Sequence, residues 1–170
     1  MYPEGSCEQT GKQGHKSRSI ITVKGCVGMY KDLNYNIETC EYDDQIINEE
    51  WCNYVYDYTC EILSKFSEEN WQELFLELPT KSTIWKKRFV DCLGDSENEN
   101  ELKALMSIAL TTDDPELFSL VICTLVDFDL SRVEGTESLF EKVEKMMPEV
   151  ANYYKNTFAQ FLEKKPIDFR

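Results

Sequence analysis

The sequence predicts an all-α fold in which about seven helices form antiparallel hairpins, stacked as a small α-solenoid-like domain behind a short extended or β N-terminal segment. Three observations predict it. Apolar residues recur at three- and four-residue steps from about residue 44 onward, helix-capping residues and prolines punctuate these stretches, and one apolar pattern returns after 32 residues. Because 42% of the 170 residues are hydrophobic, the chain is too apolar for an acidic disordered protein, and we expect a folded core.

The N-terminal residues lack helical patterning. Five of the seven glycines fall within the first 28 residues, so residues 1–18 are expected to form a flexible tail. Residues 19–24 are the one β-rich run and predict a short strand. Its candidate partner strand is an alternating set, Tyr35, Ile37 and Thr39.

Composition also divides the chain in two. Residues 1–30 hold four basic and two acidic side chains, a net charge of +2, whereas the remainder carries −16. We therefore predict a basic, Gly-rich segment over 1–30 and an acidic, all-helical domain over 31–170. Met29 lies at the break and is a candidate alternative start.

The helices are delimited by local signals. Asp43 or Asp44 is the expected N-cap of the first helix, Ser67 is that of the second, and Pro79 ends the second. Ahead of the fifth, Asp113-Asp114 and Pro115 combine a capping carboxylate with proline at the first helical position. The seven predicted helices cover residues 44–66, 68–78, 83–93, 100–110, 115–128, 136–147 and 149–162.

A shift of 32 residues superposes two consecutive predicted hairpins. The matched apolar pairs are Leu74 with Met106, Leu78 with Leu110, Trp85 with Leu117, Phe89 with Val121 and Leu93 with Leu125. Stacked hairpins of this length are typical of α-solenoids, which bind other proteins over extended surfaces. Two unrelated amphipathic hairpins with similar loops would give the same agreement, so a repeat origin stays open.

The charge balance excludes some ligands. With 18 basic and 32 acidic residues, the chain carries a formal charge of −14, and direct binding to nucleic acid is disfavoured because phosphate recognition uses a basic surface. The sequence shows neither an apolar signal region nor a stretch long enough to span a membrane, so we expect a cytoplasmic protein without membrane contact.

No constellation of catalytic or metal-binding residues is visible. The seven cysteines show no CxxC spacing and are expected to be free thiols, and His15, the single histidine, lies in the predicted tail. The paired acids precede helices, where capping accounts for them, and the acids of residues 95–101 lack a calcium-loop pattern. Residues 86–88, Lys-Lys-Arg, are expected to face solvent. We predict no enzyme activity, no cofactor, no metal and no small-molecule substrate.

Acid and tyrosine coincide in residues 30–61, which hold nine acids, one lysine and six of the nine tyrosines. Tyrosine is enriched at protein interfaces, and clustered acid steers a basic partner toward the surface. Solvation of an outer helix face explains the same acids, so both interpretations are kept. The candidate partner-binding residues are Glu41, Tyr42, Asp43, Asp44, Glu49, Glu50, Tyr56, Asp57, Asp95, Glu97 and Glu99.

Four stretches resemble a known family. Residues 71–79, 85–93, 112–118 and 161–165 are similar to the small helical immunity proteins encoded beside bacterial polymorphic toxins, including those of contact-dependent growth inhibition. The resemblance covers roughly residues 67–165 and consists of helix-packing positions. It implies a cytoplasmic protein that binds a toxin domain delivered by a neighbouring cell, and it identifies no binding residues.

Charge and resemblance together favour one hypothesis. A nuclease presents a basic cleft to its nucleic acid, and an acidic helical protein can fill that cleft. We therefore expect an immunity protein that forms a heterodimer with a basic toxin domain, an RNase by preference, and occludes its active-site face. The alternative is an acidic α-solenoid adaptor or scaffold that binds a peptide or helix of a partner in an apolar groove.

Overall fold

The computed structural model describes residues 28–39, 55–95 and 97–162. Within these ranges every regular element is a helix, which confirms the predicted all-α class. The α-helices are α1 (Met29–Thr39), α2 (Tyr56–Leu63), α3 (Glu68–Glu77), α4 (Thr83–Asp91), α5 (Glu99–Thr111), α6 (Pro115–Leu125), α7 (Thr136–Met146) and α8 (Ala151–Leu162), and the short 3-10 helices are η2 (Leu78–Thr80) and η3 (Leu130–Arg132).

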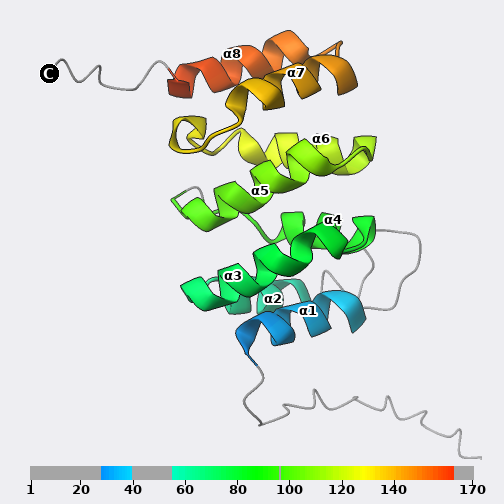
Figure 1. The fold of residues 1–170 in the computed structure, drawn as a ribbon, viewed down its shortest axis with the longest axis vertical. Helices are drawn as coiled ribbons and strands as arrows, with labels where there is room; N and C mark the ends of the chain where they lie inside the picture. The colour runs from blue at the N-terminus through cyan, green and yellow to red at the C-terminus, as the bar shows by residue number, and fades with distance from the viewer. Residues whose placement is uncertain (1–27, 40–54, 96, 163–170) are drawn as a thin grey trace, which may run out of the picture.

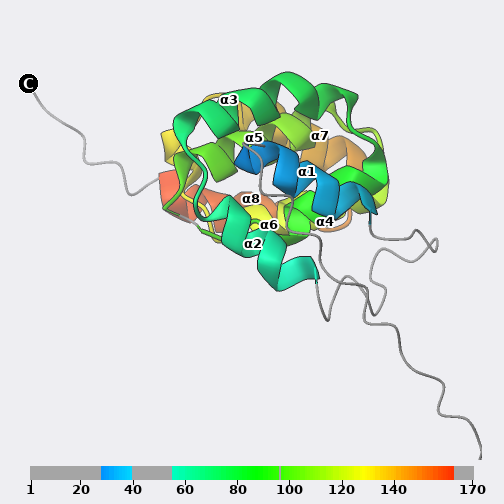
Figure 2. The same cartoon turned by 90° about the horizontal axis from the view of Figure 1, so that it is seen from below.

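The helices stack as four two-helix layers (Figure 1). Helix α1 packs beside α2 and against both α3 and α4, helix α4 packs on α6, and α5 packs on α7. Viewed along the stack, α2, α4, α6 and α8 share one side, whereas α3, α5 and α7 lie on the other (Figure 2). The predicted stack of helical hairpins is therefore confirmed for the described residues.

The 32-residue period matches this stacking. The first residues of α4 and α6, Thr83 and Pro115, are 32 positions apart, and α3 and α5 begin at Glu68 and Glu99. The last layer is offset further because η3 lengthens its connection to the layer below. Every matched apolar residue of the sequence pattern is buried except Leu110, which is half-buried.

Ser67 and Asp114 cap helices as predicted, and Ser82 caps α4. The Ser67 side chain and Asn70 form a capping box at α3, and the Ser82 hydroxyl accepts from the backbone N–H of Trp85 at 3.2 Å. Asp114 Oδ1 accepts from the N–H of Leu117 at 2.7 Å, with Pro115 as the first residue of α6. These caps satisfy N–H groups that would otherwise lack an intrahelical partner.

Helix α1 corrects the predicted N-terminal region. Tyr35, Ile37 and Thr39 lie in this helix and not in a strand, because Tyr30, Leu33 and Ile37 form a buried stripe at helical spacing against α3 and α4. The described residues therefore contain eight α-helices instead of seven. Residues 19–24 lie outside the described part, and so do residues 44–54 of the helix predicted over 44–66; the rest of that helix contains α2.

The basic cluster of α4 is also corrected. The prediction that Lys87 and Arg88 face solvent is wrong, since Lys87 is 6% exposed and Arg88 is fully buried. The reason is the stack itself, because α4 lies between α1 and α6 and so buries two faces. A single apolar stripe is the pattern of a helix that packs on one neighbour. Helix α4 has a neighbour on each side of the stack, so side chains outside its stripe are buried as well.

Candidate functional site

Metal-ligating side chains are the first candidates for a functional site among the described residues. No three His, Cys, Asp or Glu side chains converge as metal ligands there. Among the described helices, none combines the length and apolar content that a membrane span requires. His15 lies outside the described residues. Function therefore has to be sought in the surface and in side-chain contacts between helices.

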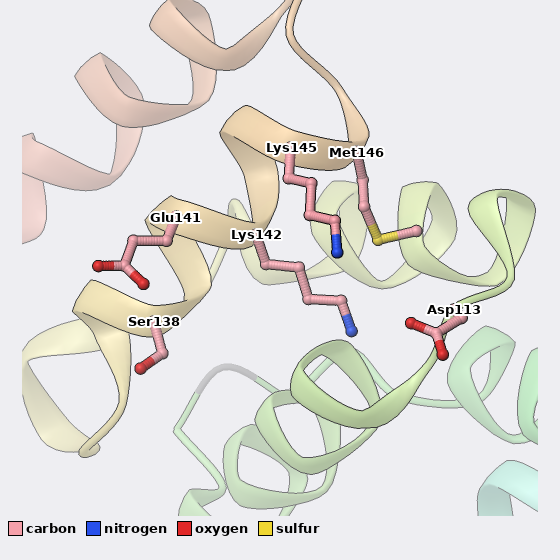
Figure 3. A pocket seen from close by; sticks show the side chains of 6 residues that line it. All are labelled: Asp113, Ser138, Glu141, Lys142, Lys145 and Met146. Atoms are coloured by element: carbon pink, nitrogen blue, oxygen red, sulfur yellow. The ribbon is translucent and has the colours of Figure 1, made fainter.

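One depression lies where α7 meets the connection between α5 and α6 (Figure 3). It has a volume of about 480 Å³, and its lining residues are Asp113, Ser138, Glu141, Lys142, Lys145 and Met146. Lys142 Nζ donates to the carbonyl oxygens of Leu110 at 3.0 Å and Thr112 at 2.5 Å. Burial lowers the pKa of Lys142, while the nearby Asp113 opposes that shift.

The contacts of Lys142 explain this depression without a ligand. A cation at the C-terminus of α5 satisfies carbonyl groups that no intrahelical N–H reaches and complements the negative end of the helix. The same ammonium lies 5.7 Å from the centroid of the Phe118 ring. Two lysines and two acids line the depression, so it has no charge preference, and Lys142 serves to hold the last two layers together.

A second cation joins the middle layers in a similar way. Lys87 Nζ on α4 lies 2.6 Å from Glu116 Oε2 and 3.4 Å from Asp114 Oδ1, both at the start of α6. Burial acts to lower the pKa of Lys87, but the hydrogen bond with Glu116 and the nearby Asp114 outweigh it, and the pKa is raised. Asp114 thus caps α6 and also pairs with the preceding layer.

The contact between α2 and the end of α4 gathers acidic side chains. Cys60 on α2 donates from Sγ to the carbonyl oxygen of Cys92, the C-cap of α4, at 4.0 Å. Two exposed carboxylates, Asp57 and Asp91, both act electrostatically on the Cys60 thiol. One carboxylate of α2 and one at the end of α4 thus both act on the thiol at this contact.

The connection from α4 to α5, which follows Asp91 along the chain, carries further acids. Asp95, Glu97 and Glu99 are exposed. Arg132 faces two of them, at 3.7 Å from Glu97 Oε2 and 3.5 Å from Glu99 Oε1. Ion pairs this exposed are worth about 0–1 kcal/mol, so both carboxylates stay available to a partner.

Glu101 holds the connection in place from inside. It is 4% exposed, and its Oε2 accepts from the backbone N–H groups of Gly94 at 2.9 Å and Asp95 at 3.0 Å. Burial raises the pKa of Glu101, and these two hydrogen bonds oppose the rise. Glu101 thus holds the backbone at Gly94 and Asp95, where the connection leaves α4.

We call this surface the acidic edge, and its residues are Asp57, Asp91, Asp95, Glu97 and Glu99. Four of these residues, Asp57, Asp95, Glu97 and Glu99, are predicted binding residues, and the structure shows all four exposed. Tyr56, also predicted, is half-buried against the core, and burial together with the Cys60 thiol raises its pKa to about 12. Its neighbour Tyr58 is 47% exposed and is the tyrosine of α2 that a partner can reach. The other six predicted residues, Glu41, Tyr42, Asp43, Asp44, Glu49 and Glu50, lie outside the described residues.

Asp91 is the member of the acidic edge that sequence reasoning missed. A signal was present, because Cys60 and Cys92 are separated by the same 32 residues as the matched layers, which brings the residues around them together. Asp91 precedes Cys92 directly, so the period would have placed it beside α2. From helical spacing alone, Asp91 is interpreted as a solvent-exposed acid with no role in binding.

Comparison with known proteins adds no family to this picture. No protein-family model matches the chain, and neither a curated protein nor a solved structure matches it.

Proposed function

We propose that the chain binds a basic partner protein through the acidic edge, as a cytoplasmic immunity protein that neutralises a nuclease toxin of contact-dependent growth inhibition. The observation that carries this proposal is that Asp57 and Asp91 are exposed and both act on the Cys60 thiol at the contact of Cys60 with Cys92, and that Asp95, Glu97 and Glu99, which follow Asp91 along the chain, are exposed as well. The role is binding, with no catalytic step and no cofactor.

Electrostatics supports a basic partner. The acidic edge holds five carboxylates. Two of them face the Arg132 guanidinium, the carboxylate of Glu97 at 3.7 Å and that of Glu99 at 3.5 Å. Clustered charge of one sign accelerates association with a partner of the opposite sign, most strongly at low salt. A nuclease must carry such a basic surface in order to hold its phosphates.

The rigidity of the edge supports tight binding. Asp57 stands on a helix, and Glu101 anchors the connection that carries Asp95 and Glu97. Because the backbone at Asp57 and Asp95 is held before binding, docking has mainly side chains to order. Tyr58 adds exposed aromatic area beside Asp57, as suits the core of an interface.

The adaptor alternative rests on one exposed side chain. Leu76 of α3 is 82% exposed, and the acids of the edge play no part in an apolar contact. Under this alternative Leu76→Ser weakens partner binding and neutralising the edge leaves it intact. Under the proposal the two results are reversed.

The proposal is tested with two triple variants of equal charge change. Asp57→Asn with Glu97→Gln and Glu99→Gln neutralises the edge. The matched control is Glu134→Gln with Glu137→Gln and Glu149→Gln, three exposed acids of α7 and its flanking turns. Against the nuclease-domain protein encoded beside this chain, we expect the edge variant to associate at least about tenfold more slowly at low salt, and the control to keep the wild-type rate. Equal rates for the two variants contradict the acidic edge as the binding surface.

A further inference from the structure

Cys60 and Cys92 form a thiol pair between α2 and the C-cap of α4. Of the three free cysteines described, they are the two that meet, since Cys60 Sγ lies 4.0 Å from the Cys92 carbonyl oxygen. Cys92 is 9% exposed, whereas Cys60, a residue of α2, is half-buried and therefore partly exposed to solvent. The third, Cys123, is exposed and contacts the Tyr154 hydroxyl at 3.5 Å.

The two thiols differ in acidity. The hydrogen bond from the Cys92 thiol lowers the pKa of Cys60, and burial opposes this effect. The same hydrogen bond raises the pKa of Cys92, as does burial. A thiol with a lowered pKa and solvent access is the attacking partner in thiol chemistry, and a buried neighbour is the resolving one.

We propose that Cys60 and Cys92 are a reversible thiol–disulfide exchange site, whose oxidant is a low-molecular-weight disulfide of the glutathione type. The geometry favours exchange because the carbonyl that Cys60 contacts belongs to Cys92 itself. Such a site is independent of the partner of the acidic edge. In a reducing compartment its disulfide is transient, as expected for a redox-sensing pair.

The exchange proceeds in two steps. The Cys60 thiolate attacks one sulfur of the small disulfide, whose S–S bond breaks to release one small thiolate and leave a mixed disulfide on Cys60. Cys92 then loses its proton to water and attacks the Cys60 sulfur, and the second small thiolate leaves. Two protein thiols are thereby oxidised to one disulfide, while the small disulfide is reduced to two thiols.

The mixed disulfide also prepares the second step. Once the Cys60 sulfur is no longer ionised, the hydrogen bond that most strongly raises the pKa of Cys92 is gone. Burial and the nearby Asp91 and Glu101 still act on Cys92, so the second step is the slower one. The product ties α2 to the end of α4, and hence Asp57 to the rest of the acidic edge.

The test uses the full chain, oxidised with glutathione disulfide and digested without reduction. We expect a loss of two free thiols and a cross-link between Cys60 and the tryptic peptide of residues 89–103, in which Cys92 is the sole cysteine. Fragment ions separate Cys60 from Cys40 and Cys52, which share its peptide. Dithiothreitol should restore both thiols.

Three variants sharpen this result. Cys92→Ser should stop the reaction at a stable glutathione adduct on Cys60, Cys60→Ser should abolish the cross-link, and Cys123→Ser should leave it unchanged. A stable glutathione adduct on wild-type Cys60, or a cross-link from residues 89–103 to any other cysteine, overturns the proposal. Because the readout is the mass of a peptide, neither result depends on the proposed partner.

Discussion

Arg88 Nη1 of α4 donates to the carbonyl oxygen of Ile37 near the end of α1, at 3.1 Å and in a fully buried position. The guanidinium joins the first layer to the second and complements the negative end of α1. Its presence in the core shows that the stack is held by polar contacts between layers as well as by apolar packing.

Replacing Arg88 therefore tests whether the first layer depends on it. Arg88→Ala leaves a cavity and removes the donor of the Ile37 carbonyl, so we expect the free energy of unfolding to fall by about 2–4 kcal/mol. Lys103→Ala, on the exposed side of α5, is the control and should change it by less than about 0.5 kcal/mol. Urea denaturation measures both, and equal stabilities would place Arg88 outside the core.

Lys142 should matter to the last layer in a comparable way. Lys142→Met keeps much of the side-chain volume but leaves the carbonyls of Leu110 and Thr112 without their donor, at a cost of about 1–3 kcal/mol. Lys145→Met, in the same depression but exposed, should be near neutral. A thermal melt that shifts equally for both variants would show that charge, and not capping, is responsible.

Asp114 gives a pH dependence of stability. The hydrogen bond from the Leu117 N–H holds the pKa of Asp114 below its ordinary value of 3.8. The positive charge of the nearby Lys87 lowers this pKa as well, to a smaller extent. Since the folded pKa lies below the unfolded one, the stabilisation is present above pH 3.8 and is lost as the pH falls through the folded value.

The matched variants separate the cap from the charge. Asp114→Ala should cost about 0.5–2 kcal/mol at pH 7, and the difference from wild type should shrink as the pH falls below the folded pKa. Asp114→Asn keeps a capping acceptor and should lose only the pairing with Lys87. Denaturation at several pH values between about 2.5 and 7 checks this, and a constant Asp114→Ala deficit over that range would contradict it.

Gly135 is the described residue with a positive φ, at 88°. A Cβ there would lie 3.2 Å from Leu110 Cδ1, so Gly135→Ala meets both backbone strain and crowding and should destabilise the fold by about 1–2 kcal/mol. Gly94→Ala is the control, because a Cβ at Gly94 would meet no atom within 4 Å. Equal stability of the two variants would show that the turn before α7 adjusts freely.

Much of the helical stack was predictable because its signals are local. Ser67, Ser82, Asp114 and Pro115 cap or begin helices through groups within three residues of themselves. The 32-residue period was also readable, since each layer buries equivalent positions. Neither signal requires knowledge of which helices meet.

The remaining features depend on contacts between distant residues. Tyr30, Leu33 and Ile37 already had helical spacing, but β-branched and aromatic residues in the same stretch favoured a strand. The burial of Lys87 and Arg88 follows from neighbours on two sides of α4, which no single-helix pattern encodes. Asp91 likewise joins the acidic edge only through the Cys60–Cys92 contact.

Inhibition of the neighbouring nuclease tests the proposed function most directly. The proposal predicts that a nuclease-domain protein is encoded beside this chain. We expect that protein to lose its activity at a one-to-one ratio in low salt, and to keep more of it when the edge variant with Asp57→Asn, Glu97→Gln and Glu99→Gln replaces the wild type. Full nuclease activity in the presence of a stoichiometric excess of the wild-type protein at low salt would contradict the immunity role.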